Sequence, residues 1–182
     1  MPRRRLRLRR RRATRRAGEA ALTGVAMTGL DRARMLSVLV PAGLLAGAYG
    51  SQYLGGLHPC EMCYWQRWPH FAALGLGLAA FVLSGLPDRG RSLVWLAALA
   101  ILVSGAIGAY HFGVELGYFE GLTRCAGGSG NLEDVFNAPL IRCDEVQYAF
   151  LGISIAGWNA ILSLGFGALI LWLSLRRSRI RT

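Results

Sequence analysis

Charge is scarce in this 182-residue chain, in which 17% of the residues are charged and 53% are hydrophobic. So little charge is unusual for a soluble globular protein. A transmembrane helix needs about 20 consecutive apolar residues, and four stretches of such length lack Asp, Glu, Lys and Arg. These stretches are 35–60, 68–87, 92–114 and 146–175. The sequence therefore predicts an all-α membrane protein with a bundle of four transmembrane helices.

Two local features refine these helices. Pro69 and Pro87 bracket the second stretch, and we expect its helix to begin near the first proline and stop at the second. Small residues recur at helical spacing, Gly43 with Gly47 and Ser104 with Gly108. They would allow close helix approach, although such residues are also common in membrane helices without that role.

Lysine is absent, and the 21 basic residues are arginines with a one-sided distribution. Eighteen of them lie before the first stretch, between the second and third, or after the fourth. Arg67, Arg124 and Arg142 share the opposite side with seven of the ten acidic residues. The arginine-rich side is normally cytoplasmic. We therefore expect both termini in the cytoplasm and two periplasmic loops, at about 55–68 and 113–147.

No long apolar run follows the basic segment 3–16, because polar residues from Glu19 to Asp31 interrupt it, so a signal peptide fits poorly. The arginines could neutralise nucleic acid, but attraction to anionic lipid headgroups is the commoner role. A true start at Met27 or Met35 is a third explanation. We expect no nucleic-acid partner and divide the chain into a disordered cytoplasmic extension (1–33), the helical bundle (34–176) and a basic cytoplasmic tail (177–182).

The four cysteines all fall on the expected outer face, where disulfides persist. Cys60 and Cys63 form a CxxC pair in the first loop, a spacing typical of redox pairs, zinc half-sites and haem motifs. Haem attachment requires histidine at position 64, where Tyr64 stands. Zinc requires four converging ligands, and two predicted crossings separate the CxxC pair from the other cysteines. We expect no metal; two purely structural disulfides remain an alternative.

Residues around Cys63 favour a reactive thiol. Cys63 is expected at the start of the second helix, where the helix dipole stabilises a thiolate. Arg67 follows one turn later on the same face, although an arginine there could instead extend to the membrane interface. His111, near the outer end of the third stretch, is expected at the same depth. His58 and His70 receive no role.

Cys125 and Cys143 enclose 17 residues rich in glycine. A disulfide in such a loop could be presented to a soluble partner and move toward the membrane, but a surface disulfide without a redox role would have the same composition. The apolar interiors carry no ionisable residue away from their ends, which disfavours a transporter.

Taken together, these motifs resemble those of the DsbB family, disulfide bond formation protein B. The resemblance runs from about Met35 to Leu175. It depends on Pro59-Cys60-x-x-Cys63 followed by Gln66-Arg67, on Tyr110-His111, and on a later cysteine pair before the last helix. The segment Phe150–Ser154, leading to Trp158-Asn159, is also similar to bacterial members.

The resemblance implies an inner-membrane protein-disulfide:quinone oxidoreductase. Cys125 and Cys143 would form the disulfide that a reduced periplasmic DsbA-type oxidase attacks, more readily at Cys125. Cys143 would then attack Cys60, and the thiolate of Cys63 would pass electrons to a bound quinone, expected to be ubiquinone. Arg67 would favour that thiolate and polarise the quinone, and His111 would help to place it. Such a relay keeps the periplasm oxidising.

The sequence departs from the family pattern in two places. The interval between Cys125 and Cys143 is shorter than in the best-known member, and Gln66 stands where some members carry an acid. The alternatives are a vitamin K epoxide reductase-like enzyme, in which the CxxC pair follows the loop pair, and a non-catalytic scaffold.

Overall fold

The computed structural model describes residues 27–85, 87–121 and 142–176. Four helices dominate it: α2 (Gly29–Tyr53), α3 (Glu61–Val82), α4 (Arg91–Glu115) and α6 (Ile155–Leu175). Helices α2, α4 and α6 are long and apolar enough to cross a membrane. Helix α3 carries Glu61, Arg67 and His70 and does not meet that criterion. The predicted helical bundle is thus confirmed, and three of its helices could span a membrane, whereas four crossings remain a prediction.

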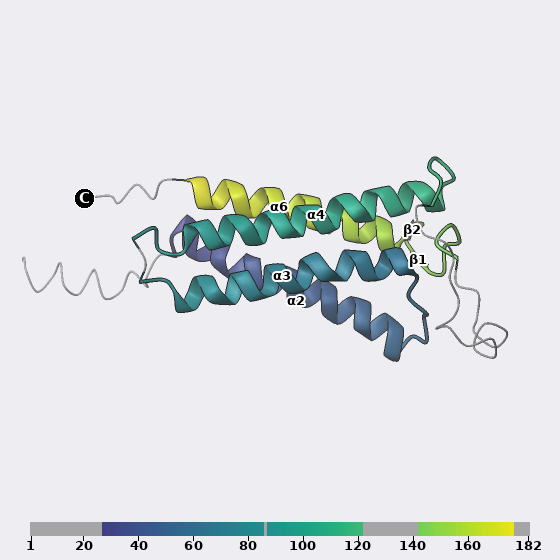
Figure 1. The fold of residues 1–182 in the computed structure, drawn as a ribbon, viewed down its shortest axis with the longest axis horizontal. Coiled ribbons are helices and arrows are strands. Elements are labelled where there is room, and N and C mark those ends of the chain that lie inside the picture. Colours follow the sequence, from purple (N-terminus) through teal and green to yellow (C-terminus); the bar gives the residue numbers. More distant parts are fainter. Residues whose placement is uncertain (1–26, 86, 122–141, 177–182) are drawn as a thin grey trace, which may run out of the picture.

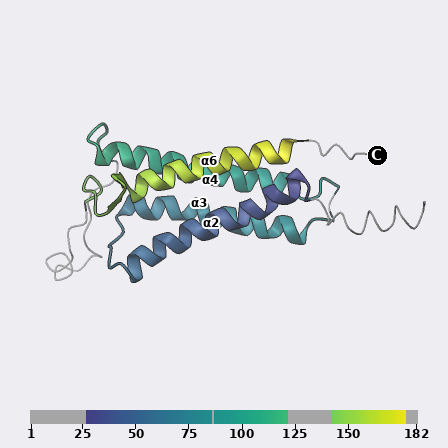
Figure 2. The ribbon, with the colours of Figure 1, turned by 180° about the vertical axis from the view of Figure 1, so that it is seen from behind.

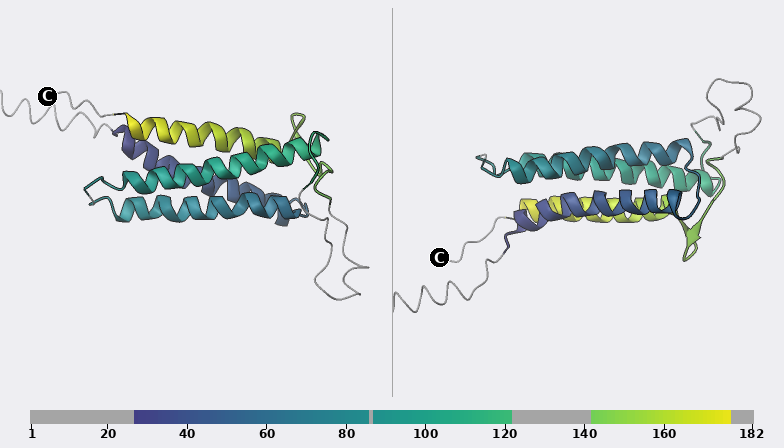
Figure 3. Two further views of the ribbon diagram at one scale, coloured as in Figure 1. Left: turned by 45° about the horizontal axis from the view of Figure 1, so that its top comes forward. Right: turned by 90° about the horizontal axis from the view of Figure 1, so that it is seen from below.

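The helices form an elongated bundle of two layers (Figure 1). Helices α3 and α4 make one layer and α2 and α6 the other, as the right view of Figure 3 shows. Helix α4 packs most extensively against α6 and α3. Both ends of the described chain lie at one end of the bundle with the α3–α4 connection, and the other connections lie at the far end (Figure 2).

Helix α2 begins earlier than the expected domain boundary at residue 34. The Thr28 hydroxyl accepts a hydrogen bond from Asp31 N, and the Asp31 carboxylate accepts one from Thr28 N, which completes a capping box. Arg34 is buried here and donates to the carbonyl of Arg89 in the α3–α4 connection. The last residues of the expected extension therefore belong to the first helix.

Helix α3 begins where the expectation for Cys63 placed it, but earlier than Pro69 suggested. Cys60 is its N-cap, so the helix starts at Glu61 and Pro69 lies within it, and it ends at Val82, before Pro87. The expectation that Pro69 opens this helix was wrong. The sulfur of Cys60 accepts a hydrogen bond from a backbone N–H of the first turn, so the helix begins more than two turns before Pro69. The CxxC pair thereby belongs to the helix terminus.

A small hairpin precedes α6. Strands β1 (Ala149–Phe150) and β2 (Ile153–Ser154) pair antiparallel through a turn in which Leu151 and Gly152 both have positive φ, at 53° and 79°. Two consecutive positive φ angles are the geometry of a type I′ hairpin turn. Ser154 then caps α6 by accepting from Gly157 N. The segment Phe150–Ser154, which resembles bacterial members, thus forms the hairpin and the N-cap that precede α6.

Small residues mediate close helix contact at some expected positions only. A Cβ on Gly108 would lie 2.9 Å from Asn159 Nδ2 and 3.0 Å from the carbonyl oxygen of Ala156, so this α4 position requires glycine, as predicted. Gly43 and Gly47 have no neighbour within 4 Å of such a Cβ. Their expected packing role was wrong, because α2 faces a cavity there.

Gly77 and Gly75 of α3 provide a matched test of helix packing. A Cβ on Gly77 would lie 2.7 Å from the backbone oxygen of Ser37 in α2, whereas one on Gly75 meets nothing. We expect Gly77→Ala to destabilise the bundle by about 1–3 kcal/mol, and Gly75→Ala to be neutral or slightly stabilising. Thermal unfolding in detergent measures both, and equal midpoints for the two variants would contradict this helix packing.

Candidate functional site

The N-terminus of α3 holds the CxxC pair. Cys60 Sγ accepts from the backbone N–H of Cys63 at 3.4 Å, and the two sulfurs lie 3.0 Å apart with the Cys60 thiol donating. A donated hydrogen bond stabilises negative charge on the accepting sulfur, as does the positive end of the helix dipole. A disulfide requires about 2.05 Å between sulfurs, so closing the pair needs only a small movement.

The environment of Cys60 opposes its ionisation. Donation of its S–H to Cys63, followed by burial, raises the pKa of Cys60 to about 12, and His111 opposes this rise. Because the thiolate is the nucleophile, Cys60 is the poorer nucleophile of the reduced pair. The two cysteines are chemically unequal, with Cys63 the one prepared to carry charge.

His111 reaches the pair from α4, where it is 2% exposed. Its Nε2 lies 3.6 Å from Cys60 Sγ and 3.2 Å from the carbonyl oxygen of Cys143. Glu115, one turn further along α4, lies 3.9 Å from the same nitrogen and accepts from the Ser154 hydroxyl. His111 therefore contacts both the sulfur of Cys60 and the backbone of Cys143.

Cys143 lies beside the CxxC pair. It is 4% exposed and packs in one buried cluster with Cys60, Met62 and Val114. The fold thus brings together cysteines from the two predicted loops, as the resemblance required. Cys125 lies outside the described residues.

Arg67 is 7% exposed and turns toward α2. Its Nη1 donates to Gln52 Oε1 at 2.7 Å and its Nη2 to the carbonyl oxygen of Ala48 at 3.3 Å. The guanidinium also lies over the rings of Tyr49 and Tyr64, at 4.8 and 5.0 Å from their centroids. An arginine held by these contacts is part of the bundle, which argues against the interpretation that it extends freely to the interface.

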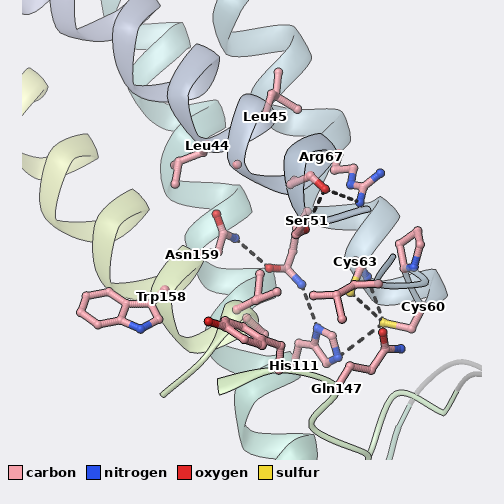
Figure 4. A pocket seen from close by; sticks show the side chains of 18 of the residues that line it. Leu44, Leu45, Ser51, Cys60, Cys63, Arg67, His111, Gln147, Trp158 and Asn159 are labelled. Atoms are coloured by element: carbon pink, nitrogen blue, oxygen red, sulfur yellow. Dashed lines mark hydrogen bonds between the residues drawn. The ribbon is translucent and has the colours of Figure 1, made fainter. Parts of the chain in front are cut away.

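A cavity of about 370 Å³ lies among α2, α3, α4 and α6, and the CxxC cysteines line it (Figure 4). This volume is within the range typical of small-molecule sites. One wall is apolar and comes from α2, and the polar wall contains the expected site residues. That wall includes Cys60, Cys63, Arg67 and His111. Four of the six predicted site residues therefore surround one cavity, with Cys143 packed against Cys60.

The CxxC pair and His111 also offer three ligand atoms within 4.8 Å of one another, a set that could hold a metal ion. The sequence argument against zinc looked for the second cysteine pair as the missing ligands and did not anticipate the histidine. The expectation that the site holds no metal stays a prediction.

Sequence reasoning assigned no role to four polar residues of the site. Gln52 anchors Arg67, Glu115 contacts His111, and Gln66 and Asn159 join His111 to α6. Glu115 was detectable, because it stands one helical turn after His111. Gln66 and Asn159 were marked only by their place in family-like segments, and no local pattern marks Gln52, which acts across helices.

A membrane bundle that places a reduced CxxC pair against a third cysteine, beside an apolar cavity, has the features of a membrane thiol–disulfide oxidoreductase. The chain belongs to the DsbB family, whose model, "Disulfide bond formation protein DsbB", matches residues 31–173. It is accordingly a disulfide-forming oxidoreductase and a multi-pass membrane protein. This membership excludes the vitamin K epoxide reductase-like alternative.

Relatives named disulfide bond formation protein B are similar over most of their length. The protein of Marinobacter nauticus is 32% identical over 163 residues, covering 78% of this chain and 90% of the relative. That of Azoarcus sp. is 32% identical over 151 residues, covering 77% and 89%, and that of Hahella chejuensis is 28% identical over 154 residues, covering 79% and 93%. No solved structure matches this chain.

The difference in acidity between the two thiols predicts the pH at which Cys60 is alkylated. In the reduced protein, Cys60 should resist iodoacetamide near neutral pH and react only in strongly alkaline solution, because its pKa is raised to about 12. Cys63→Ala removes the largest cause of that shift and should move Cys60 labelling to lower pH. Peptide mass spectrometry measures both, and rapid labelling of Cys60 at neutral pH in the unaltered chain would contradict the assigned hydrogen bond.

Proposed function

We propose that this protein reoxidises a DsbA-type periplasmic thiol oxidase and passes the electrons to a membrane quinone. The observation that carries the proposal is the position of Cys63, which lines an apolar cavity together with Arg67 while its partner Cys60 contacts the Cys143 cluster. A disulfide with a purely structural role would need neither the cavity nor the buried arginine. This arrangement favours an electron path from the loop cysteines to a ligand within the bundle.

The proposed topology has four crossings, with both termini in the cytoplasm and the cysteines at the periplasmic face of the inner membrane. Arg34, Arg89, Arg91 and Arg176 gather at one end of the bundle and the CxxC pair lies at the other. This charge asymmetry supports the assignment. Helix α3 crosses despite Arg67, because the Arg67 side chain is satisfied by Gln52, a carbonyl and two aromatic rings.

The residues present fit a quinone. The α2 wall of glycine and leucine accommodates an apolar ring, and Arg67 supplies a positive charge for a carbonyl oxygen. His70 also lines the cavity, and among the described residues its buried Nδ1 has no hydrogen-bond partner. A bound quinone, which we take to be ubiquinone, would supply the acceptor of two electrons.

The steps on the protein are thiol–disulfide exchanges. The reduced partner attacks the Cys125–Cys143 disulfide at Cys125, so that a mixed disulfide between the partner and Cys125 forms and Cys143 leaves as a thiolate. The second thiol of the partner then resolves the mixed disulfide, which leaves the partner oxidised and Cys125 reduced. Cys143 attacks Sγ of Cys60, so that the Cys60–Cys143 bond forms, the Cys60–Cys63 bond breaks and Cys63 leaves with the electron pair. Arg67 and the terminus of α3 stabilise that thiolate beside the cavity. His111 contacts Cys60 and holds the approaching loop.

The cysteine that faces the cavity should be indispensable. With a reduced DsbA-type protein and a soluble ubiquinone analogue, we expect the wild type to turn over and Cys63→Ser to lose turnover, measured by quinone absorbance. Gly75→Ala is the control, since it lies on the same helix without a contact. Absence of turnover in a folded wild type with two disulfides would instead support the scaffold alternative.

Arg67 should act on the quinone more than on the protein partner. Loss of hydrogen bonds to a charged group costs about 1.5–3 kcal/mol, so Arg67→Ala should raise the KM for the quinone analogue roughly ten- to a hundredfold. The KM for the reduced partner should change little. Steady-state kinetics with each substrate varied separately measures both, and an unchanged KM for quinone would refute this role.

A further inference from the structure

A chain of buried polar side chains crosses the bundle and ends at the CxxC pair. Asn159 of α6 donates through Nδ2 to Gln66 Oε1 of α3 at 2.8 Å, and Gln66 Nε2 lies 2.9 Å from His111 Nδ1 of α4. His111 then contacts Cys60, and Figure 4 shows Asn159 and His111 on either side of this connection. The proposed function assigns no role to Gln66 or Asn159.

Two backbone carbonyls determine which way the amides face. Asn159 Nδ2 lies 3.2 Å from the carbonyl oxygen of Ser104, and a carbonyl only accepts, so the amide nitrogen faces it. Gln66 Nε2 likewise donates to the carbonyl oxygen of Met62 at 3.2 Å. Gln66 Oε1 is then free to accept from Asn159, and the orientation of each amide is fixed.

These orientations fix the proton on His111. Since Gln66 presents an N–H to Nδ1, that nitrogen must be the acceptor. The other ring nitrogen, Nε2, lies 3.2 Å from the carbonyl oxygen of Cys143 and must therefore be the donor. The contacts at the two sides of the ring agree, and both require a neutral imidazole with its proton on Nε2.

The Nε2 proton points at the place where Cys60 and Cys143 lie together. It faces the Cys143 carbonyl oxygen and also Cys60 Sγ, which lies 3.6 Å from the Nε2 atom. Cys60 and Cys143 also pack in one buried cluster. A histidine with the proton on Nδ1 would turn a lone pair toward a carbonyl oxygen and would repel the loop.

We propose that Gln66 and Asn159 are positioning residues, which hold His111 in its Nε2–H form so that this N–H fixes the Cys143 backbone beside Cys60. The step served is the internal exchange, in which the thiolate of Cys143 bonds to Cys60 and Cys63 leaves as thiolate. No electrons leave the protein in that step. The inference rests on the proposed function for its biological purpose, but its geometry can be tested without quinone or partner.

The histidine tautomer is directly measurable. ¹⁵N spectra of histidine-labelled protein distinguish a protonated from an unprotonated ring nitrogen, and His111→Gln assigns the signal among three histidines. We expect Nδ1 of His111 to be unprotonated in the wild type and protonated in Gln66→Glu, where a carboxylate replaces the amide donor. A wild-type His111 with the proton on Nδ1 would overturn the proposal, and this result does not depend on whether Gln66→Glu folds.

The positioning effect is measured as the effective concentration of Cys143 at Cys60. In full-length protein carrying Cys63→Ala and Cys125→Ala, equilibration in glutathione buffers gives the stability of the Cys60–Cys143 disulfide. Because one net hydrogen bond is worth about 1 kcal/mol, we expect Gln66→Leu to lower this value about fivefold. Ser174→Ala, which removes a buried hydrogen bond at the opposite end, should leave it unchanged.

The outcomes separate the two proposals. An effective concentration that is unchanged in Gln66→Leu overturns the positioning role, even where wild-type quinone turnover is normal. Conversely, a protein without quinone turnover in which Gln66→Leu lowers the effective concentration refutes the proposed function and leaves the positioning of Cys143 intact.

Discussion

The geometry of the site depends on one hydrogen bond, between the sulfur of Cys60 and the backbone N–H of Cys63. A helix terminus leaves N–H groups without partners, and here a thiol serves as the cap, where serine, threonine or aspartate is usual. The cap starts α3 at Glu61 and places Cys63 in the first turn. Both sulfurs thereby line the cavity, and the thiol of Cys60 donates to the sulfur of Cys63.

Starting α3 at this cap also brings its polar residues into the bundle. Gln66, Arg67 and His70 follow within two and a half turns and are all buried. Buried polar groups in an apolar bundle are costly unless they are hydrogen-bonded. Gln66 and His70 are joined to α4 and α6, and Arg67 to α2. The polar groups that could serve the chemistry therefore also connect the helices, so site and fold are stabilised by the same contacts.

Much of the site was predictable because its signals are local. The CxxC spacing, Arg67 one turn after Cys63, and His111 at the outer end of its helix each depend on a few neighbouring residues. Predictions failed where packing decided the outcome. Pro69 did not open its helix because an earlier cap was available, and Gly43 and Gly47 face a cavity rather than a neighbouring helix.

The sequence by itself determined the helical membrane class, the positions of the apolar stretches and the DsbB motifs, because hydropathy and spacing act over short distances along the chain. Only the tertiary structure decided that His111 meets Cys60, 51 residues away, and that Asn159 meets Gln66, 93 residues away. Such contacts depend on the relative rotation and depth of four packed helices. Those quantities follow from side-chain packing across the whole bundle, which no single segment of the sequence contains.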